Sequence, residues 1–100
     1  MSVHLVALGD STAVGVGAAR SGGYPDQLAS RLRREGLSVG LTNLGVSGAR
    51  AADVVAGQLK RAVAAQPTLV TLGIGVNDLW RGTSLESFAE DLERLSLIHI

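Results

Sequence analysis

Cysteine is missing from the 100 residues of this chain. Its absence excludes a disulfide framework and a thiolate metal site, and it leaves the redox compartment open. Aromatic residues are scarce at 3%, whereas 46% of the residues are hydrophobic and 13 are glycine. The core of such a chain must consist of Leu, Val and Ala packed against close-lying backbone. This composition favours a single α/β domain over a β-sandwich.

An excess of charge of either sign is also missing, because nine basic residues balance nine acidic ones. A neutral chain lacks the electrostatic footprint of a nucleic-acid or anionic-membrane binder, so we expect no nucleic-acid partner. No apolar run approaches the roughly 20 residues that cross a bilayer. The N-terminal MSVHLVAL has no basic segment ahead of its apolar residues, unlike a signal peptide. We therefore expect a cytoplasmic protein without a membrane span.

Three short apolar segments have the pattern of buried strands. The first runs from Val3 to Leu8, is nearly all apolar and is bounded by Gly9, which is typical of a strand covered on both faces. Residues 37–44 and 68–72 are the other two. A helical pattern follows each of them. This alternation predicts an open parallel sheet with helices packed on its two faces.

Three amphipathic helices are predicted between and after these strands. The first lies between Pro25 and Gly36, which suit the start and the stop of a helix. The second carries an apolar stripe made up of Ala49, Ala52, Val55, Leu59 and Ala62. The third begins after Thr83, which with Glu86 has the spacing of a capping box. Its predicted apolar face consists of Leu85, Phe88, Ala89 and Leu92.

The residues that follow the three strands carry the chemistry. Ligands bind beyond the carboxyl ends of the strands in an open α/β sheet, so the three following loops share one edge. These loops hold Gly9 to Ser11, Gly45 to Gly48 and, within a predicted loop over 73–82, Gly75 to Asp78. A hydroxyl, glycine backbone and a carboxamide are the parts that acyl transfer needs, because a serine that attacks a carbonyl creates an oxyanion.

These three segments, in this order, resemble the sequence blocks of the SGNH hydrolases, also called the GDSL esterase and lipase family. The matching residues are GDS at Gly9 to Ser11, Gly48 within NLGVSGA, and GxND at Gly75 to Asp78. The resemblance extends to about Arg94. It implies a flavodoxin-like three-layer α/β/α sandwich with a parallel sheet, and hydrolysis of carboxylic esters through an acyl-serine intermediate. The implied substrate is a small-molecule or lipid-like acyl ester, with no metal or organic cofactor.

The resemblance also implies the roles of individual residues. Ser11 matches the nucleophile of the family. The Ser11 N–H, the Gly48 N–H and the side-chain amide of Asn77 match the donors that stabilise the oxyanion. The family completes its site with an Asp-x-x-His block near the C-terminus, and this block is absent from the 100 residues. The base that would take the serine proton is therefore missing from the motif set.

Neither histidine of the chain fits that base. His4 lies seven residues before the serine, on the order of 20 Å away along a strand. His99 has Ser96 at the position where the block has Asp. In addition, LSLIHI at residues 95–100 resembles the in-frame translation of a transposon end used as a sequencing adaptor. We therefore expect this segment to be a non-native tail.

Residues 1–94 are then expected to be the N-terminal part of a single SGNH hydrolase domain, truncated after about three strands. Such a chain would be inactive by itself because it lacks the base. In the flavodoxin-like strand order the first strand lies between the second and the third. The third strand would form an apolar open edge, so we expect marginal stability and a tendency to aggregate.

A non-catalytic or nucleotide-binding domain of the flavodoxin or Rossmann type is the alternative interpretation. Gly15 and Gly17 could begin a dinucleotide fingerprint, but Arg20 stands where its third glycine belongs. A phosphate-binding Walker loop needs Lys followed by Ser or Thr after its glycines, and none follows. The G-x-S-x-G motif of α/β-hydrolases is broken by Ala13. The residues thus favour the SGNH-type serine hydrolase over this alternative.

Overall fold

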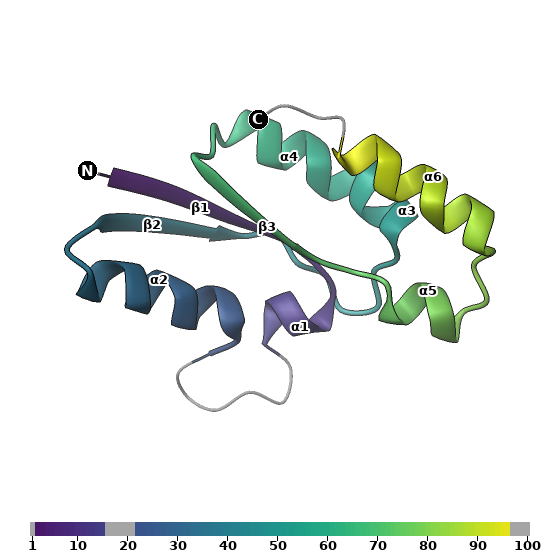
Figure 1. The fold of residues 1–100 in the computed structure, drawn as a ribbon, viewed down its shortest axis with the longest axis horizontal. Coiled ribbons are helices and arrows are strands. Elements are labelled where there is room, and N and C mark those ends of the chain that lie inside the picture. The colour runs from purple at the N-terminus through teal and green to yellow at the C-terminus, as the bar shows by residue number, and fades with distance from the viewer. Residues whose placement is uncertain (1, 16–21, 97–100) are drawn as a thin grey trace.

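The computed structural model describes residues 2–15 and 22–96, and a sheet of three parallel strands forms its middle layer (Figure 1). These strands are β1 (Ser2–Gly9), β2 (Ser38–Asn43) and β3 (Leu69–Gly73). Their order in the sheet is β2-β1-β3, and both neighbouring pairs are parallel. The predicted parallel sheet, with the first strand between the second and third, is confirmed.

The helices cover both faces of the sheet. The helical elements are α1 (Ser11–Val14), α2 (Tyr24–Arg34), α3 (Ala51–Asp53), η1 (Val54–Gln58), α4 (Leu59–Ala64), α5 (Val76–Trp80) and α6 (Leu85–Ser96). Figure 1 shows α2 on one side of the sheet and α3, α4 and α6 on the other. This is the α/β sandwich that the alternating pattern predicts. No helix in the described part of the chain is long and apolar enough to cross a membrane.

The middle strand β1 is buried on both faces, as its apolar sequence predicts. Leu5 to Leu8 are each at most 2% exposed. Side chains alternate between the two faces of a strand, so Val6 and Leu8 point to the same side. There they pack with Val54 and Ala62 of the η1 and α4 helix. The opposite face of β1 is covered as well, and the strand is fixed from both sides up to the residues that precede Ser11.

The helix after β2 corrects the predicted apolar stripe. It is continuous from α3 through η1 to α4, and its buried residues are Ala51, Val54, Gln58 and Ala62. Ala52 of the predicted stripe is exposed. Ala51, Val54, Gln58 and Ala62 are three or four residues apart and share one face of the helix, and Ala52 lies outside that face. The Asp78 carboxylate accepts from the Ala51 N–H and holds this end of the helix. The helix also contains a π-helical turn at η1, where the Leu59 N–H donates to the Val54 carbonyl, five residues back.

The segment at residues 73–82 is not entirely a loop, contrary to the prediction. Val76 to Trp80 form the short helix α5, in which the Leu79 N–H donates to the Gly75 carbonyl at 3.1 Å. Glycine and Asn-Asp pairs are typical of turns, and one helical turn contains too few residues to show a period. Asn77 and Asp78 therefore lie on a helical turn, which fixes the directions of their side chains.

The last helix also begins differently from the prediction. The cap of α6 is Ser84, whose Oγ accepts a hydrogen bond from the Ser87 N–H at 3.1 Å, and not Thr83. Leu85 is 82% exposed and Ala89 is exposed as well, so both lie outside the apolar face, contrary to the prediction. Phe88 remains half-buried, as predicted. Two neighbouring hydroxyl residues offer the same capping chemistry, and only the path of the chain selects between them.

The outer edge of β3 is open in the described residues. Leu69 and Leu72 of this strand are each 41% exposed. A hollow of about 290 Å³ lies along the same edge and includes Pro67, Val70 and Leu95 in its lining. The open apolar edge is therefore present, and the marginal stability expected from it stays a prediction.

Candidate functional site

The carboxyl ends of the three strands meet at one edge of the sheet. In register, Ala7 of β1 lies opposite Asn43, the last residue of β2. Gly9, the last residue of β1, lies opposite Gly73, the last residue of β3. The three segments that carry the sequence blocks leave the sheet from these positions, which is the predicted arrangement.

Hydrogen bonds tie the first of these segments to the other two. The Val46 N–H, in the segment after β2, donates to the Gly9 carbonyl at 3.0 Å. On the other side, the Asp10 N–H donates to the Gly73 carbonyl at 3.3 Å. The backbone at the end of β1, just before Ser11, is thus hydrogen-bonded on both sides, to the segment after β2 and to the end of β3.

Ser11 is the first residue of α1, and Asp10 is its N-cap. The Asp10 carboxylate accepts a hydrogen bond from the Thr12 N–H at 2.9 Å and contacts the Thr12 hydroxyl. Asp10 is 1% exposed, whereas Ser11 is only half-buried. Within the described residues, neither the Ser11 hydroxyl nor its N–H has a hydrogen-bond partner. Ser11 therefore presents a free hydroxyl and a free N–H at a helix start, where four N–H groups lack intrahelical acceptors.

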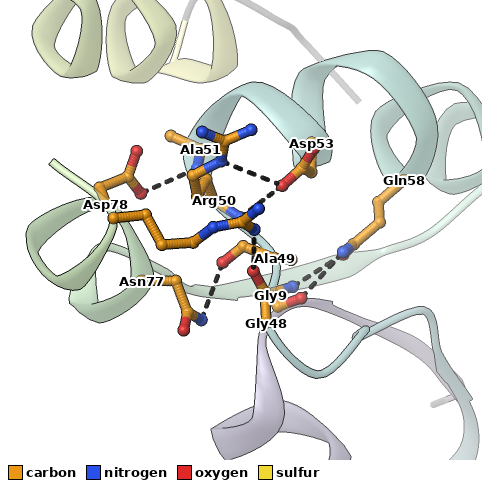
Figure 2. A network of polar contacts seen from close by, with 10 residues as sticks. Gly9, Gly48, Ala49, Arg50, Ala51, Asp53, Gln58, Asn77 and Asp78 are labelled. Carbon is orange, nitrogen blue, oxygen red and sulfur yellow. Dashed lines mark hydrogen bonds and ion pairs between the residues drawn. The ribbon is translucent and has the colours of Figure 1, made fainter. Parts of the chain in front are cut away.

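The segment after β2 is fastened to the helix after β3 (Figure 2). The Asn77 side-chain amide donates to the Ala49 carbonyl at 3.0 Å, and the Asp78 carboxylate accepts from the Ala51 N–H at 2.9 Å. Asp78 is 4% exposed, and Ala51 is the first residue of α3. A carboxylate at this position stabilises a helix start through its hydrogen bond and through the helix dipole. Asp78 thus holds the start of α3 against α5.

Gly48 is exposed and lies next to this junction. Its φ is +84°, a conformation that residues with a Cβ rarely adopt. Its N–H has no acceptor within the described residues, while its carbonyl accepts from the Arg81 guanidinium at 3.4 Å. Because only one hydrogen of the Asn77 amide is engaged, Gly48 and Asn77 each retain a free N–H at this edge.

A hollow of about 410 Å³ opens beside Gly48. Its wall is formed by apolar side chains of the segment after β2 and by polar ones of the η1 and α4 helix. The lining includes Leu44, Val46, Gly57, Gln58, Arg61 and Arg81. The hollow has space for a small organic group next to one of the three candidate donors.

Two residues that support the site were not singled out in the sequence. Gln58 makes two hydrogen bonds to the backbone of Gly9, at 2.8 Å each. Asn43 accepts from the Gly45 N–H at 3.0 Å and donates to the Ala13 carbonyl at 2.7 Å, which ties the segment after β2 to α1. Gln58 could have been found from the sequence, because a glutamine within an apolar helical pattern is unusual. Asn43 is the first residue of NLGVSGA, and its position at the end of the second strand could have revealed it.

The His4 side chain is hydrogen-bonded far from this edge. It lies opposite Gly40 near the amino end of the sheet, and its Nε2 is 2.8 Å from the Thr42 hydroxyl. His99 and the rest of 97–100 lie outside the described residues. So do Gly17 and Arg20, on which the nucleotide-binding alternative depends. No described histidine reaches Ser11.

The described part of the chain is an open parallel α/β sandwich with a serine directly after its middle strand. Residues 7–96 match the model of the GDSL-like lipase/acylhydrolase family, and the chain belongs to this family. No curated protein sequence matches the chain.

Solved structures support the same assignment. The chain is 33% identical to AlinE4, an SGNH-hydrolase family esterase, with a TM-score of 0.79 over 92% of this chain and 50% of that one. It is 29% identical to TesA, with a TM-score of 0.79 over 89% and 49% of the two chains. A family 3 carbohydrate esterase of Clostridium thermocellum, 21% identical, shares the fold with a TM-score of 0.81 over 95% and 55%. The chain thus spans about half the length of these structures.

Proposed function

We propose that this protein acts as a serine hydrolase that cleaves carboxylic esters through an acyl-serine intermediate. In this proposal, Ser11 is the nucleophile, and the Ser11 N–H, the Gly48 N–H and the Asn77 amide stabilise the oxyanion. The observation that carries the proposal is a set of free polar groups at one edge. Within the described residues, the Ser11 hydroxyl and two backbone N–H groups are unpartnered, and the three segments are hydrogen-bonded to one another.

The reaction follows from this chemistry. The Ser11 Oγ forms a bond to the ester carbonyl carbon while a general base takes its proton, and the carbonyl oxygen becomes an oxyanion. Preorganised N–H donors stabilise that charge more than they stabilise the neutral ester. The carbon–oxygen bond to the alcohol then breaks, and the alcohol leaves with the proton that the base had taken. Water attacks the acyl-serine in the same way and releases the carboxylic acid.

The general base is proposed to lie outside the described residues. His4 is held at the other end of the sheet, and the remaining described side chains near Ser11 include no histidine. In the complete enzyme, by which we mean the gene product that carries residues 1–94 within an entire domain, an Asp-x-x-His block would supply it. The 100-residue chain alone would then be inactive, and residues 95–100 would not be native.

The proposed substrate is a small-molecule or lipid-like acyl ester. The hollow beside Gly48 can take a group of modest size, and its apolar wall at Leu44 and Val46 suits a hydrocarbon part. AlinE4, at 33% identity, is an esterase. A cytoplasmic location remains a prediction from the sequence.

Labelling with a fluorophosphonate tests the proposed nucleophile. This reagent forms a covalent bond with an activated serine, so we expect the complete enzyme to be labelled and Ser11→Ala to be unlabelled. Ser30→Ala is the control, because Ser30 is an exposed serine of α2, outside the three segments at the sheet edge. Labelling that persists in Ser11→Ala would show that another residue is the nucleophile.

A further inference from the structure

We infer that Gln58 is a positioning residue for the nucleophile, and this inference rests on the proposed function. Its side-chain amide makes two hydrogen bonds to the backbone of Gly9 (Figure 2). The Gly9 N–H donates to the Gln58 Oε1, and the Gln58 Nε2 donates to the Gly9 carbonyl, both at 2.8 Å. The two residues are 49 positions apart in the chain. Nothing in the motif set assigns a role to Gln58.

The amide continues the sheet where the strand pairing stops. The register between β1 and β2 ends with Ala7 opposite Asn43, two residues before the end of β1. Beyond that point, the Gly9 N–H has a side-chain acceptor instead of a strand acceptor. A primary amide carries one carbonyl and N–H donors on the same group, so it can bind the N–H and the carbonyl of one residue much as a neighbouring strand does. Gln58 therefore fixes Gly9 at the end of β1, together with the Val46 N–H, which donates to the same carbonyl at 3.0 Å.

Gly9 can be held only through its backbone. A Cβ at this position would overlap the carbonyl oxygen of Gly73, and the φ of Gly9 is +142°. With no side chain to pack, the strand end depends on hydrogen bonds for its position. Asp10 and Ser11 follow directly, so a shift of the Gly9 peptide would move both the Ser11 hydroxyl and the Ser11 N–H.

Gln58 lies on the buried face of its helix. It is the last residue of η1, and it is 5% exposed between the buried residues Val54 and Ala62. Residues four apart share one face of a helix, and π-helical turns such as η1 occur frequently at functional sites. Burying an amide is unfavourable unless its polar atoms are hydrogen-bonded, and both are bonded to Gly9. The unusual turn and the buried amide thus point to the same contact.

Gln58 also borders the hollow beside Gly48, but its polar atoms are occupied by Gly9. If it positions Ser11, then losing it lowers kcat and leaves KM nearly unchanged. If it binds substrate, KM rises instead. The two roles therefore give opposite results in steady-state kinetics.

The decisive variant is Gln58→Glu in the complete enzyme. A protonated carboxyl group has the same size and can both accept from the Gly9 N–H and donate to its carbonyl. An ionised carboxylate can only accept and faces the carbonyl oxygen. We expect a loss in kcat of at least about tenfold at pH 8, as misplacement of catalytic groups can cost up to about a hundredfold. The ratio of variant to unmodified kcat should approach one as the pH is lowered to 5.

Gln66→Glu is the control because it adds the same charge at an exposed residue after α4. Its kcat relative to the unmodified enzyme should not vary with pH. Gln58→Leu should have a lower kcat at every pH. If this variant does not fold, the pH series of Gln58→Glu still tests the positioning role of Gln58. An unchanged kcat in Gln58→Glu, a ratio independent of pH, or a change confined to KM would each overturn the inference.

Ester hydrolysis by the unmodified complete enzyme shows whether a failure concerns this inference or the proposed function. If it shows no ester hydrolysis that depends on Ser11, the proposed function fails. If it hydrolyses esters through Ser11 and Gln58→Glu is equally active, only the role of Gln58 fails.

Discussion

The side-chain nitrogen of Asn77 lies 3.0 Å from the carbonyl oxygen of Ala49, and this hydrogen bond joins two segments that are far apart in the chain. Asn77 belongs to α5, and Ala49 directly follows Gly48. The bond fixes the orientation of the amide and leaves its second hydrogen free. A donor that is already oriented needs no rearrangement when a negative charge develops beside it.

Asn77→Ala in the complete enzyme should lower kcat by roughly 10²-fold or more, as removal of one oxyanion donor does. The lost bond to Ala49 should cost about 1 kcal/mol of unfolding free energy. Steady-state kinetics and urea unfolding measure the two effects. Gln27→Ala is the control, because the Gln27 amide donates to the Gly22 carbonyl at 3.2 Å in an exposed position. Unchanged turnover in Asn77→Ala would leave Asn77 with a structural role only.

The 100-residue chain and its Ser11→Ala variant should hydrolyse p-nitrophenyl acetate at the same rate. Loss of a triad member costs several powers of ten in rate, and the one histidine among the described residues, His4, lies at the other end of the sheet. Parallel assays at equal protein concentration compare the two chains. A clear rate that disappears with Ser11 would mean that the chain contains its own base.

Asp78→Ala should destabilise the complete enzyme by about 1–3 kcal/mol, because the Ala51 N–H would lose its acceptor in a buried place. Asp53→Ala is a matched control. Asp53 also accepts from a backbone N–H, that of Arg50 at 2.8 Å, but it is exposed. Water can replace an exposed acceptor, so its loss should cost less. Equal losses in urea unfolding would argue against a special role for the buried carboxylate.

Gly9→Ala should prevent normal folding, whereas Gly36→Ala should be tolerated. Both glycines have a positive φ, at +142° and +93°. A Cβ on Gly9 would overlap the Gly73 carbonyl, but a Cβ on Gly36 would have no heavy atom within 4 Å. Backbone strain alone costs roughly 1–2 kcal/mol. Soluble yield and thermal unfolding of the two variants distinguish overlap from strain, and similar behaviour of both would contradict the close approach at Gly9.

Much of the arrangement could be predicted from local patterns. The apolar run before Gly9 identified a doubly covered strand, and the alternation of strands and helices predicted a parallel sheet. Parallel strands end at one edge, so Ser11, Gly48 and Asn77 had to lie on neighbouring segments. The family of the chain followed from the same three blocks.

The helix details could not be predicted in the same way. The predicted stripe included Ala52, whereas the buried face carries Ala51 and Gln58, and the turn of α5 was too short for a period to appear. The choice of Ser84 over Thr83 as a cap depended on the path of the chain. Each of these outcomes follows from packing against the sheet, which local propensity does not contain.

The sequence by itself determined the order of the elements, the covered middle strand and the set of chemical groups at the sheet edge. These depend on residue type and period, which are local properties. Only the tertiary structure decided how the groups are held, because their partners are remote in the chain. Gln58 binds Gly9 across 49 positions, and Asp78 binds Ala51 across 27. A hydrogen bond depends on distance and direction in space, and the fold alone brings such residues together.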